Sequence, residues 1–152
     1  MRREKTLQEL IDDLQVNYFV ICDQVITDAG TSKQSLIGIF SAISSEQLPL
    51  HVNMAVALCL RVHSARERRL RLRLTDPDGQ ALFDTALPCD WDPVRKGLEH
   101  STFSTLQMGI NLQALPLTKQ GVYMAALYAD DMPVATYLLS VLTQKVKPPL
   151  VN

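Results

Sequence analysis

This sequence has almost no excess of charge of either sign, few glycines and no long apolar run. Its 152 residues carry 15 Lys and Arg against 16 Asp and Glu, so no overall field attracts nucleic acid or a membrane surface. Six glycines form no Gly-rich phosphate loop, and no apolar run approaches the roughly 20 residues that span a bilayer. The first residues, MRREKTLQELIDDLQ, lack the apolar core of a secretory signal. We therefore expect a cytoplasmic protein that does not enter a membrane.

Cysteine and histidine are also scarce. Cys22, Cys59 and Cys89 are odd in number and show no CxxC spacing, which argues against a disulfide framework and against a thiolate zinc site. His51 and His63 lie about 40 Å apart if one strand carries both, too far to share a metal. No GxSxG, Walker A, GxGxxG, HExxH or EF-hand pattern occurs. We expect no catalytic residue, no metal site and no cofactor, and therefore no enzyme.

The chain is rich in two-residue alternation of apolar and polar side chains, which is typical of β-strands. From 51 to 63 the even-numbered residues are apolar and are predicted to face the core, while Ala55, Ala57 and Cys59 face outward. From 68 to 75 three leucines alternate with arginines. Further strands are predicted at 17–22, 35–44, 80–87, 101–112, 122–129 and 134–142. The predicted core includes Leu58, Leu60, Leu72, Leu74, Met108 and Ile110.

Turn signals separate these strands at fairly regular spacing. They include Asp28-Ala29-Gly30, Asp76-Pro77-Asp78-Gly79 and Asp130-Asp131-Met132-Pro133. Residues 88–98 hold two prolines and a glycine and are predicted to form a loop. Because no βαβ alternation appears, the pattern predicts an antiparallel β-sandwich of seven or eight strands over residues 16–144.

The N-terminal segment follows a different period. Leu7, Leu10, Ile11 and Leu14 stand at i, i+3, i+4 and i+7 and predict a short amphipathic α-helix within residues 1–15. A helix of about 12 residues is marginal on its own, so its apolar stripe must pack on something. It could pack in cis on its own sandwich near Tyr18 or Val20, or in trans on a second copy to form a homo-oligomer. Residues 145–152 are predicted to form a flexible tail.

The final third, LQALPLTKQGVYMAALYADDMPVATYLLSV, resembles the closing strands of immunoglobulin-like sandwiches. Tyr123 follows Gly121 by two residues and is placed like a tyrosine-corner residue, whose hydroxyl ties a loop to the sandwich. The segments CDQV at 22–25, SLIGIF at 35–40 and LRLTDPDG at 72–79 add to this. Residues 17–142 look like an uncharacterised bacterial family of small, single-domain immunoglobulin-like proteins. The resemblance implies an immunoglobulin-like β-sandwich and no catalytic residues.

The strongest local charge asymmetry lies between residues 61 and 73, which hold six arginines and one glutamate. The strand pattern predicts that Arg61, Arg69, Arg71 and Arg73 share one sheet face. Such a face could bind an acidic protein or a phosphate backbone, or it could be solvated and paired with acidic residues across strands. No aromatic residues interleave with these arginines, which weakens the case for binding a single nucleic-acid strand.

Trp91 is the only tryptophan and stands between Asp90 and Asp92 in the predicted loop. It could close over the core, contact a partner protein or stack on a sugar, and the two carboxylates could serve glycoside hydrolysis. Adjacent loop residues usually point apart, however. We expect a non-enzymatic protein–protein interaction module that uses the helix stripe, the arginine face or Trp91. The alternatives are a nucleic-acid-binding accessory protein using the arginines and a sugar-binding module using Trp91.

Overall fold

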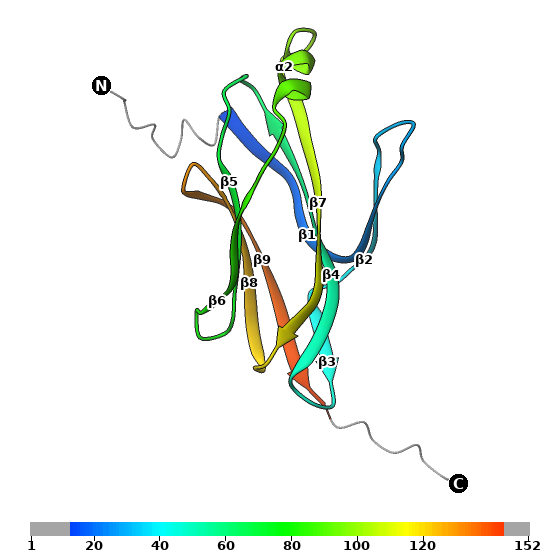
Figure 1. Cartoon of the computed structure of the whole chain (residues 1–152), viewed down its shortest axis with the longest axis vertical. Coiled ribbons are helices and arrows are strands. Elements are labelled where there is room, and N and C mark those ends of the chain that lie inside the picture. The colour runs from blue at the N-terminus through cyan, green and yellow to red at the C-terminus, as the bar shows by residue number, and fades with distance from the viewer. Residues whose placement is uncertain (1–12, 145–152) are drawn as a thin grey trace.

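The computed structural model describes residues 13–144 and contains two β-sheets packed face to face (Figure 1). The first sheet has the order β2 (Gln34–Ile39), β1 (Leu14–Thr27), β4 (Leu50–Val62) and β7 (Ser104–Leu117). The second has the order β3 (Ala42–Ser45), β9 (Met132–Thr143), β8 (Gly121–Ala129), β5 (Leu70–Thr75) and β6 (Ala81–Leu87). No helix within these residues is long and apolar enough to cross a membrane. The predicted β-sandwich is confirmed, but the described residues form nine strands where seven or eight were predicted, and one pair, β3 with β9, is parallel and not antiparallel.

The core lies between the sheets and follows the alternation of the sequence. Leu58 and Leu60 of β4 and Leu72 and Leu74 of β5 are buried, as predicted. Met108 and Ile110 pack against the same cluster but are only half-buried. They lie on β7, which is the edge strand of the first sheet and has a neighbour on one side only.

The strand predicted for residues 35–44 is two strands in two different sheets. β2 pairs antiparallel with β1 in the first sheet, whereas β3 runs parallel to β9 in the second. Between them, the Phe40 N–H donates to the Ile21 carbonyl at 3.2 Å, and the Ser41 carbonyl accepts from the Ser140 N–H at 2.8 Å. Alternation continues through this crossing, so the sequence pattern does not indicate where the chain changes sheet.

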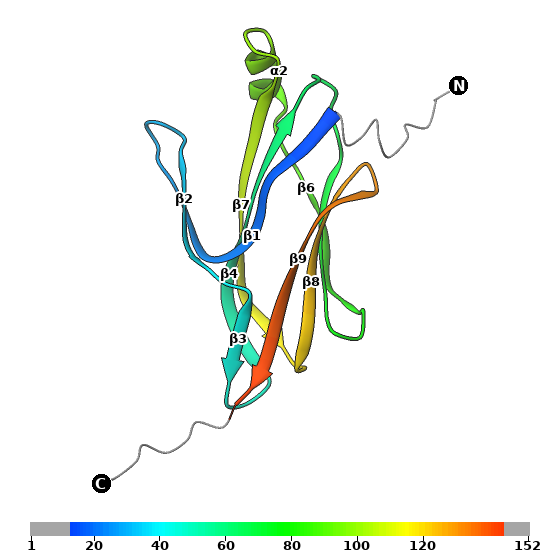
Figure 2. The same ribbon diagram turned by 180° about the vertical axis from the view of Figure 1, so that it is seen from behind.

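Residues 92–98 form the helix α2 (Asp92–Leu98), and the prediction of a loop there is wrong (Figure 2). Proline is accepted in a first helical turn, because the N–H that it lacks would have no partner there. Asp92 in the first turn and Arg95 and Lys96 in the last complement the helix dipole. The segment is too short for apolar periodicity to be visible in the sequence.

The N-terminal prediction is only partly covered by the described residues. Leu14, which we placed in the helix stripe, begins β1 and is buried in the main core. Leu14 stands four residues after Leu10, as on one face of a helix, and two residues before Val16, as on one face of a strand. In the structure it belongs to the strand. Leu7, Leu10 and Ile11 lie outside the described residues, as does the tail at 145–152. The helix and its contact with a second copy therefore stay predictions.

Tyr123 forms the tyrosine corner that the resemblance implied. It is fully buried, its hydroxyl donates to the Lys119 carbonyl at 2.8 Å, and the Lys119 N–H donates back to it at 3.0 Å. Gly121 keeps the loop tight, because a Cβ there would lie 2.8 Å from a carbon of Pro77.

Changing Tyr123 to Phe is expected to lower the free energy of unfolding by about 1–3 kcal/mol, because both backbone groups of Lys119 lose their partner. Urea denaturation of the variant and the wild type measures this. Tyr128→Phe is the control, because its half-buried ring packs beside Arg71, and its change should stay within about 0.5 kcal/mol. Equal stabilities for Tyr123→Phe and wild type would contradict the role of the hydroxyl.

Candidate functional site

The predicted arginine face is partly present on the outer side of the five-stranded sheet. Arg71 and Arg73 alternate with the buried leucines of β5, and Arg69 precedes that strand. All three pair with carboxylates: Arg71 and Arg73 approach Asp84 at 3.1 and 3.9 Å, and Arg69 lies 3.2 Å from Asp131. Exposed pairs of this kind stabilise a fold by roughly 0–1 kcal/mol. The pairing leaves little free positive charge to attract phosphate.

Arg61 does not belong to this face, and the prediction that it does is wrong. It lies on β4, in the other sheet. Its guanidinium donates to the Gln15 side chain and lies 5.8 Å from the centre of the Phe103 ring. The chain passes from one sheet to the other between β4 and β5, and side-chain alternation cannot reveal that passage.

Trp91 packs into the core immediately before α2. Only 5% of its surface is exposed, and the guanidinium of Arg68 lies 5.5 Å from its ring centre. The flanking carboxylates are engaged locally: Asp90 accepts the Asp92 N–H at 3.0 Å, and Asp92 pairs with Arg95. Of the roles left open by the sequence, this burial fits closing over the core.

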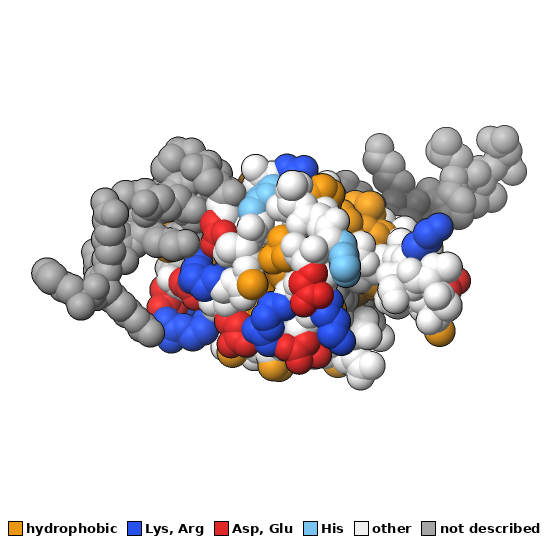
Figure 3. Space-filling view, turned by 90° about the horizontal axis from the view of Figure 1, so that it is seen from above, with side chains coloured by type: hydrophobic (Ala, Val, Ile, Leu, Met, Phe, Trp, Pro, Cys, Tyr) orange, Lys and Arg blue, Asp and Glu red, His pale blue; other side chains and the backbone are white. Residues whose placement is uncertain are grey.

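Two of the remaining arginines belong to an ion-pair network at the same end of the sandwich. Arg68 has no exposed side-chain surface and lies 2.5 Å from Asp13, and Arg66 bridges Asp13 at 3.4 Å and Asp130 at 2.6 Å. Although partial burial acts to raise the pKa of Asp130, hydrogen bonds from Arg66 and from the Arg69 N–H hold it below its usual value. Figure 3 looks down on this end and shows acidic and basic side chains interspersed, with no uniform basic patch.

The largest feature that the sequence did not indicate is the hairpin formed by β1 and β2, which stands away from the sandwich in Figures 1 and 2. Ile26, Ile37 and Ile39 are 44%, 46% and 57% exposed on it, and we call them the isoleucine surface. β2 is also the edge strand of its sheet, so within residues 13–144 no strand pairs with its outer side. Exposed aliphatic side chains and an open strand edge therefore coincide.

The opposite side of this hairpin packs on the outer face of the four-stranded sheet. Val25 and Leu36 pack against a small apolar cluster of Cys22, Ala55 and Ala57. The sequence predicted that Ala55, Ala57 and Cys59 face outward from the main core. All three are buried. Val25 and Leu36 of the hairpin and Tyr18 and Val20 of β1 pack over Ala55 and Ala57, and the Asn17 side chain donates to the Cys59 sulfur at 3.6 Å.

Two further contacts fasten the hairpin to the sheet. The Tyr18 hydroxyl donates to the Gln34 side chain at 2.5 Å. Gly109 of β7 leaves room for Val25, since a Cβ at that position would lie 3.0 Å from a methyl carbon of Val25. The isoleucine surface is thus presented by an arm that is packed in place.

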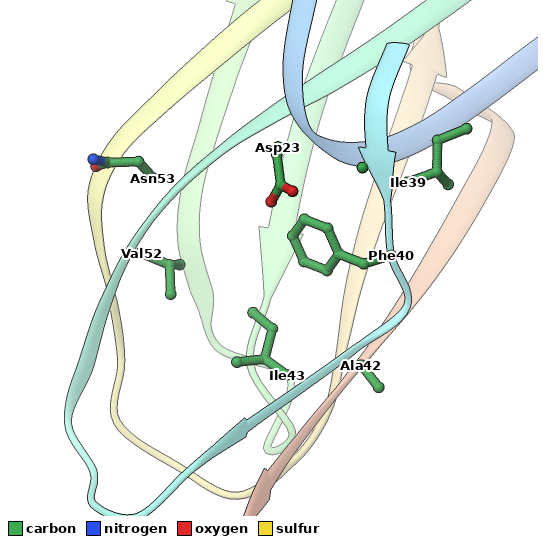
Figure 4. Close-up of a pocket in the computed structure, with 8 residues that line it drawn as sticks. Asp23, Ile39, Phe40, Ala42, Ile43, Val52 and Asn53 are labelled. Atoms are coloured by element: carbon green, nitrogen blue, oxygen red, sulfur yellow. The ribbon is translucent and has the colours of Figure 1, made fainter.

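A pocket of about 360 Å³ opens at the base of the hairpin, where the chain passes from β2 to β3 (Figure 4). Its lining is mostly apolar and consists of Asp23, Gly38, Ile39, Phe40, Ala42, Ile43, Val52 and Asn53. Gly38 has φ +67°, and a Cβ there would lie 2.1 Å from an oxygen of Asp23. Only glycine therefore lets the Asp23 carboxylate take this place.

The surface and the pocket present aliphatic side chains, an open strand edge and one carboxylate. Among the residues that the structure describes, no group of three or more His, Cys, Asp or Glu could hold a metal ion. Burial raises the pKa of the Cys22 thiol, and it does the same for Cys89 with help from Glu67 and Asp90, which keeps both thiols protonated. An open strand edge can bind the backbone of an extended segment, and a neighbouring pocket can take its side chains.

Comparison with known proteins was informative at the level of the family. The model of DUF6941, a family of unknown function, matches residues 17–142. No curated protein matches the chain.

Two solved structures illustrate what the fold is similar to. An immunoglobulin-like protein from Pseudomonas aeruginosa is 13% identical, with 85% of this chain and 96% of that chain covered and a TM-score of 0.47. The alkylpurine DNA glycosylase AlkC from Pseudomonas fluorescens, bound to DNA containing an abasic site analog, is 5% identical, with 86% and 30% covered and a TM-score of 0.46. At these TM-scores neither likeness carries an argument about function.

Proposed function

The chain belongs to DUF6941, a family of unknown function, which fits its resemblance to uncharacterised immunoglobulin-like proteins, and we propose that it is a non-enzymatic protein-interaction module. The partner supplies an extended segment that pairs with the outer edge of β2 and covers the isoleucine surface. The observation that carries the proposal is the coincidence of three exposed isoleucines with an open strand edge on a packed arm.

The composition of β2 supports this use of the edge. Natural edge strands are usually protected by charged side chains or proline, because an open edge pairs readily with other chains. The sequence of β2 is QSLIGI and contains neither. An unprotected, aliphatic edge strand lowers the solubility of a protein unless another segment covers it. Pairing with a partner strand would explain why β2 has this composition.

The expected affinity of the isoleucine surface alone is modest. Full burial of an isoleucine side chain contributes about 1.5–3 kcal/mol, and roughly half of each side chain is still exposed here. The three together then contribute roughly 2–4 kcal/mol before the cost of ordering the partner. Backbone hydrogen bonds along β2 must add to this, which favours a partner in extended conformation.

The two alternatives suggested by the sequence have less support. Nucleic-acid binding through the arginine face would need Arg69, Arg71 and Arg73 to leave their carboxylate partners. Sugar binding through Trp91 would need a ring face that the core and Arg68 now cover.

The double change Ile37→Asp and Ile39→Asp is expected to weaken partner capture from the native cell at least about tenfold, the equivalent of 1.4 kcal/mol, because two carboxylates would be buried in the interface. The matched control is Val122→Asp with Leu138→Asp, comparably exposed aliphatic residues on the other sheet. Quantitative mass spectrometry of captured proteins gives the ratio, and thermal unfolding confirms that both variants fold. Undiminished capture by the hairpin variant, or loss only in the control, would place the binding surface elsewhere.

A further inference from the structure

The last described residues bring the C-terminal segment 145–152 to one end of β3. β9 and β3 run parallel, with Thr143 opposite Ser45, and the Gln144 N–H donates to the Ser45 carbonyl at 2.9 Å. Figure 2 shows the two strands ending side by side. The pocket lies at the other end of β3, where Ala42 and Ile43 line it.

The segment is long enough to return to the pocket. From Ser45 back to Ala42 is three residue steps, or about 10 Å along a strand. Eight residues, 145–152, extend at most about 26–29 Å. After turning beyond Gln144, the chain therefore has length to spare when it runs back along the open edge of β3.

The chemistry of the segment matches that of the pocket. Its sequence, KVKPPLVN, combines two lysines with three aliphatic side chains, and its two prolines favour an extended backbone. Figure 4 shows the acidic Asp23 beside the Phe40 ring, with Ile43 on the other side of that ring, so the pocket offers an apolar surface and one carboxylate.

Charge complementarity extends along β3. Asp23 lies in the pocket at one end of the strand, and Glu46 follows directly after its other end. Within residues 13–144 neither carboxylate has an ion-pair partner, whereas Asp84, Asp130 and Asp131 elsewhere on the surface do. Lys145 and Lys147 are the two cations of the segment that would run between them.

We propose that residues 145–152 dock on their own chain, along β3 and into the pocket, with Leu150 against Ile43 and Val52 and with the two lysines beside Glu46 and Asp23. The proposal is independent of the partner proposed above. Because Ile39 belongs both to the pocket and to the isoleucine surface, the docked segment would also cover one end of that surface.

Backbone ¹⁵N relaxation of the full chain tests this docking. In the wild type, the amides of Val146, Leu150 and Val151 should have order parameters near the rigid value of about 0.85, and not below the flexible limit of about 0.6. Leu150 methyl protons should show nuclear Overhauser effects to those of Ile43 and Val52. A segment that relaxes as a free coil in the wild type, without these effects, would overturn the proposal.

Two sets of variants separate docking from misfolding. Leu150→Asp changes only the segment and should bring its order parameters below about 0.6 while the strand amides keep their shifts. Asp23→Lys with Glu46→Lys should do the same, and adding Lys145→Glu and Lys147→Glu should restore docking by reversing both charges. Glu99→Lys is the matched control, an exposed carboxylate after α2 at the far end of the sandwich, and should have no effect.

A mixture of isotope-labelled and unlabelled protein separates docking within a chain from docking between copies. Nuclear Overhauser effects from Leu150 that are seen only between labelled and unlabelled molecules would overturn docking on the same chain. Ile37 does not line the pocket, so loss of partner capture on changing Ile37 alone concerns only the interaction proposed above.

Discussion

Replacing Arg68 with methionine is expected to lower the free energy of unfolding by about 3–5 kcal/mol, the usual cost of removing one partner from a buried ion pair. Arg68 has no exposed side-chain surface and lies 2.5 Å from Asp13. Its guanidinium also donates to the carbonyls of Ser64 and Arg66 at 3.2 and 2.6 Å. Methionine keeps most of the volume over Trp91 but satisfies none of these acceptors.

Arg69→Met is the control for this effect, because Arg69 is the next residue, is exposed and makes a surface ion pair. We expect it to change the free energy of unfolding by no more than about 0.5 kcal/mol. Urea denaturation, followed by the fluorescence of Trp91, measures both variants. Similar small losses in the two would mean that the network around Asp13 contributes no more than a surface pair does.

Leu72→Ala is expected to cost about 2–5 kcal/mol, from lost apolar burial and from the cavity that remains. Leu72 is fully buried at the centre of β5, opposite Leu127 of β8 and Thr85 of β6. Because β5 lies between β8 and β6, the sheet can close only partly into the cavity left by the Leu72 side chain.

The neighbouring change Arg71→Ala tests the register of β5 in the same assay. Arg71 points outward and pairs with Asp84, so its loss should cost about 1 kcal/mol or less. A larger loss for Arg71→Ala than for Leu72→Ala would mean that the strand has the opposite face inward.

The predictions about function depended on surface neighbours, and there the sequence was a poor guide. Arg69, Arg71 and Arg73 form a dense basic run in the sequence, yet Asp84 and Asp131 reach them from other strands or turns. Pro88 and Pro93 predict a loop around Trp91 and leave its role open, whereas in the structure Pro93 lies in the first turn of α2.

The isoleucine surface lies in a stretch whose composition fits two different strand positions. The stretch SLIGIF has no charged residue, and its composition predicts a strand without indicating whether that strand is central or at an edge. An edge strand without charge has the same composition as a central strand with both faces covered. Which of the two forms depends on whether a neighbour lies beyond β2, and composition does not record that.

Local pattern alone determined most of the strands, their inward faces and the turns between them, because period-2 alternation and turn chemistry act over a few residues. The tyrosine corner at Tyr123 came from the resemblance to immunoglobulin-like sandwiches. Only the tertiary structure decided which strands share a sheet. That pairing separates Arg61 from Arg71, divides the strand predicted for residues 35–44 between the two sheets, and leaves β2 at an open edge. Strand pairing joins residues far apart in the chain, so the candidate surfaces appear only once the strands are assembled.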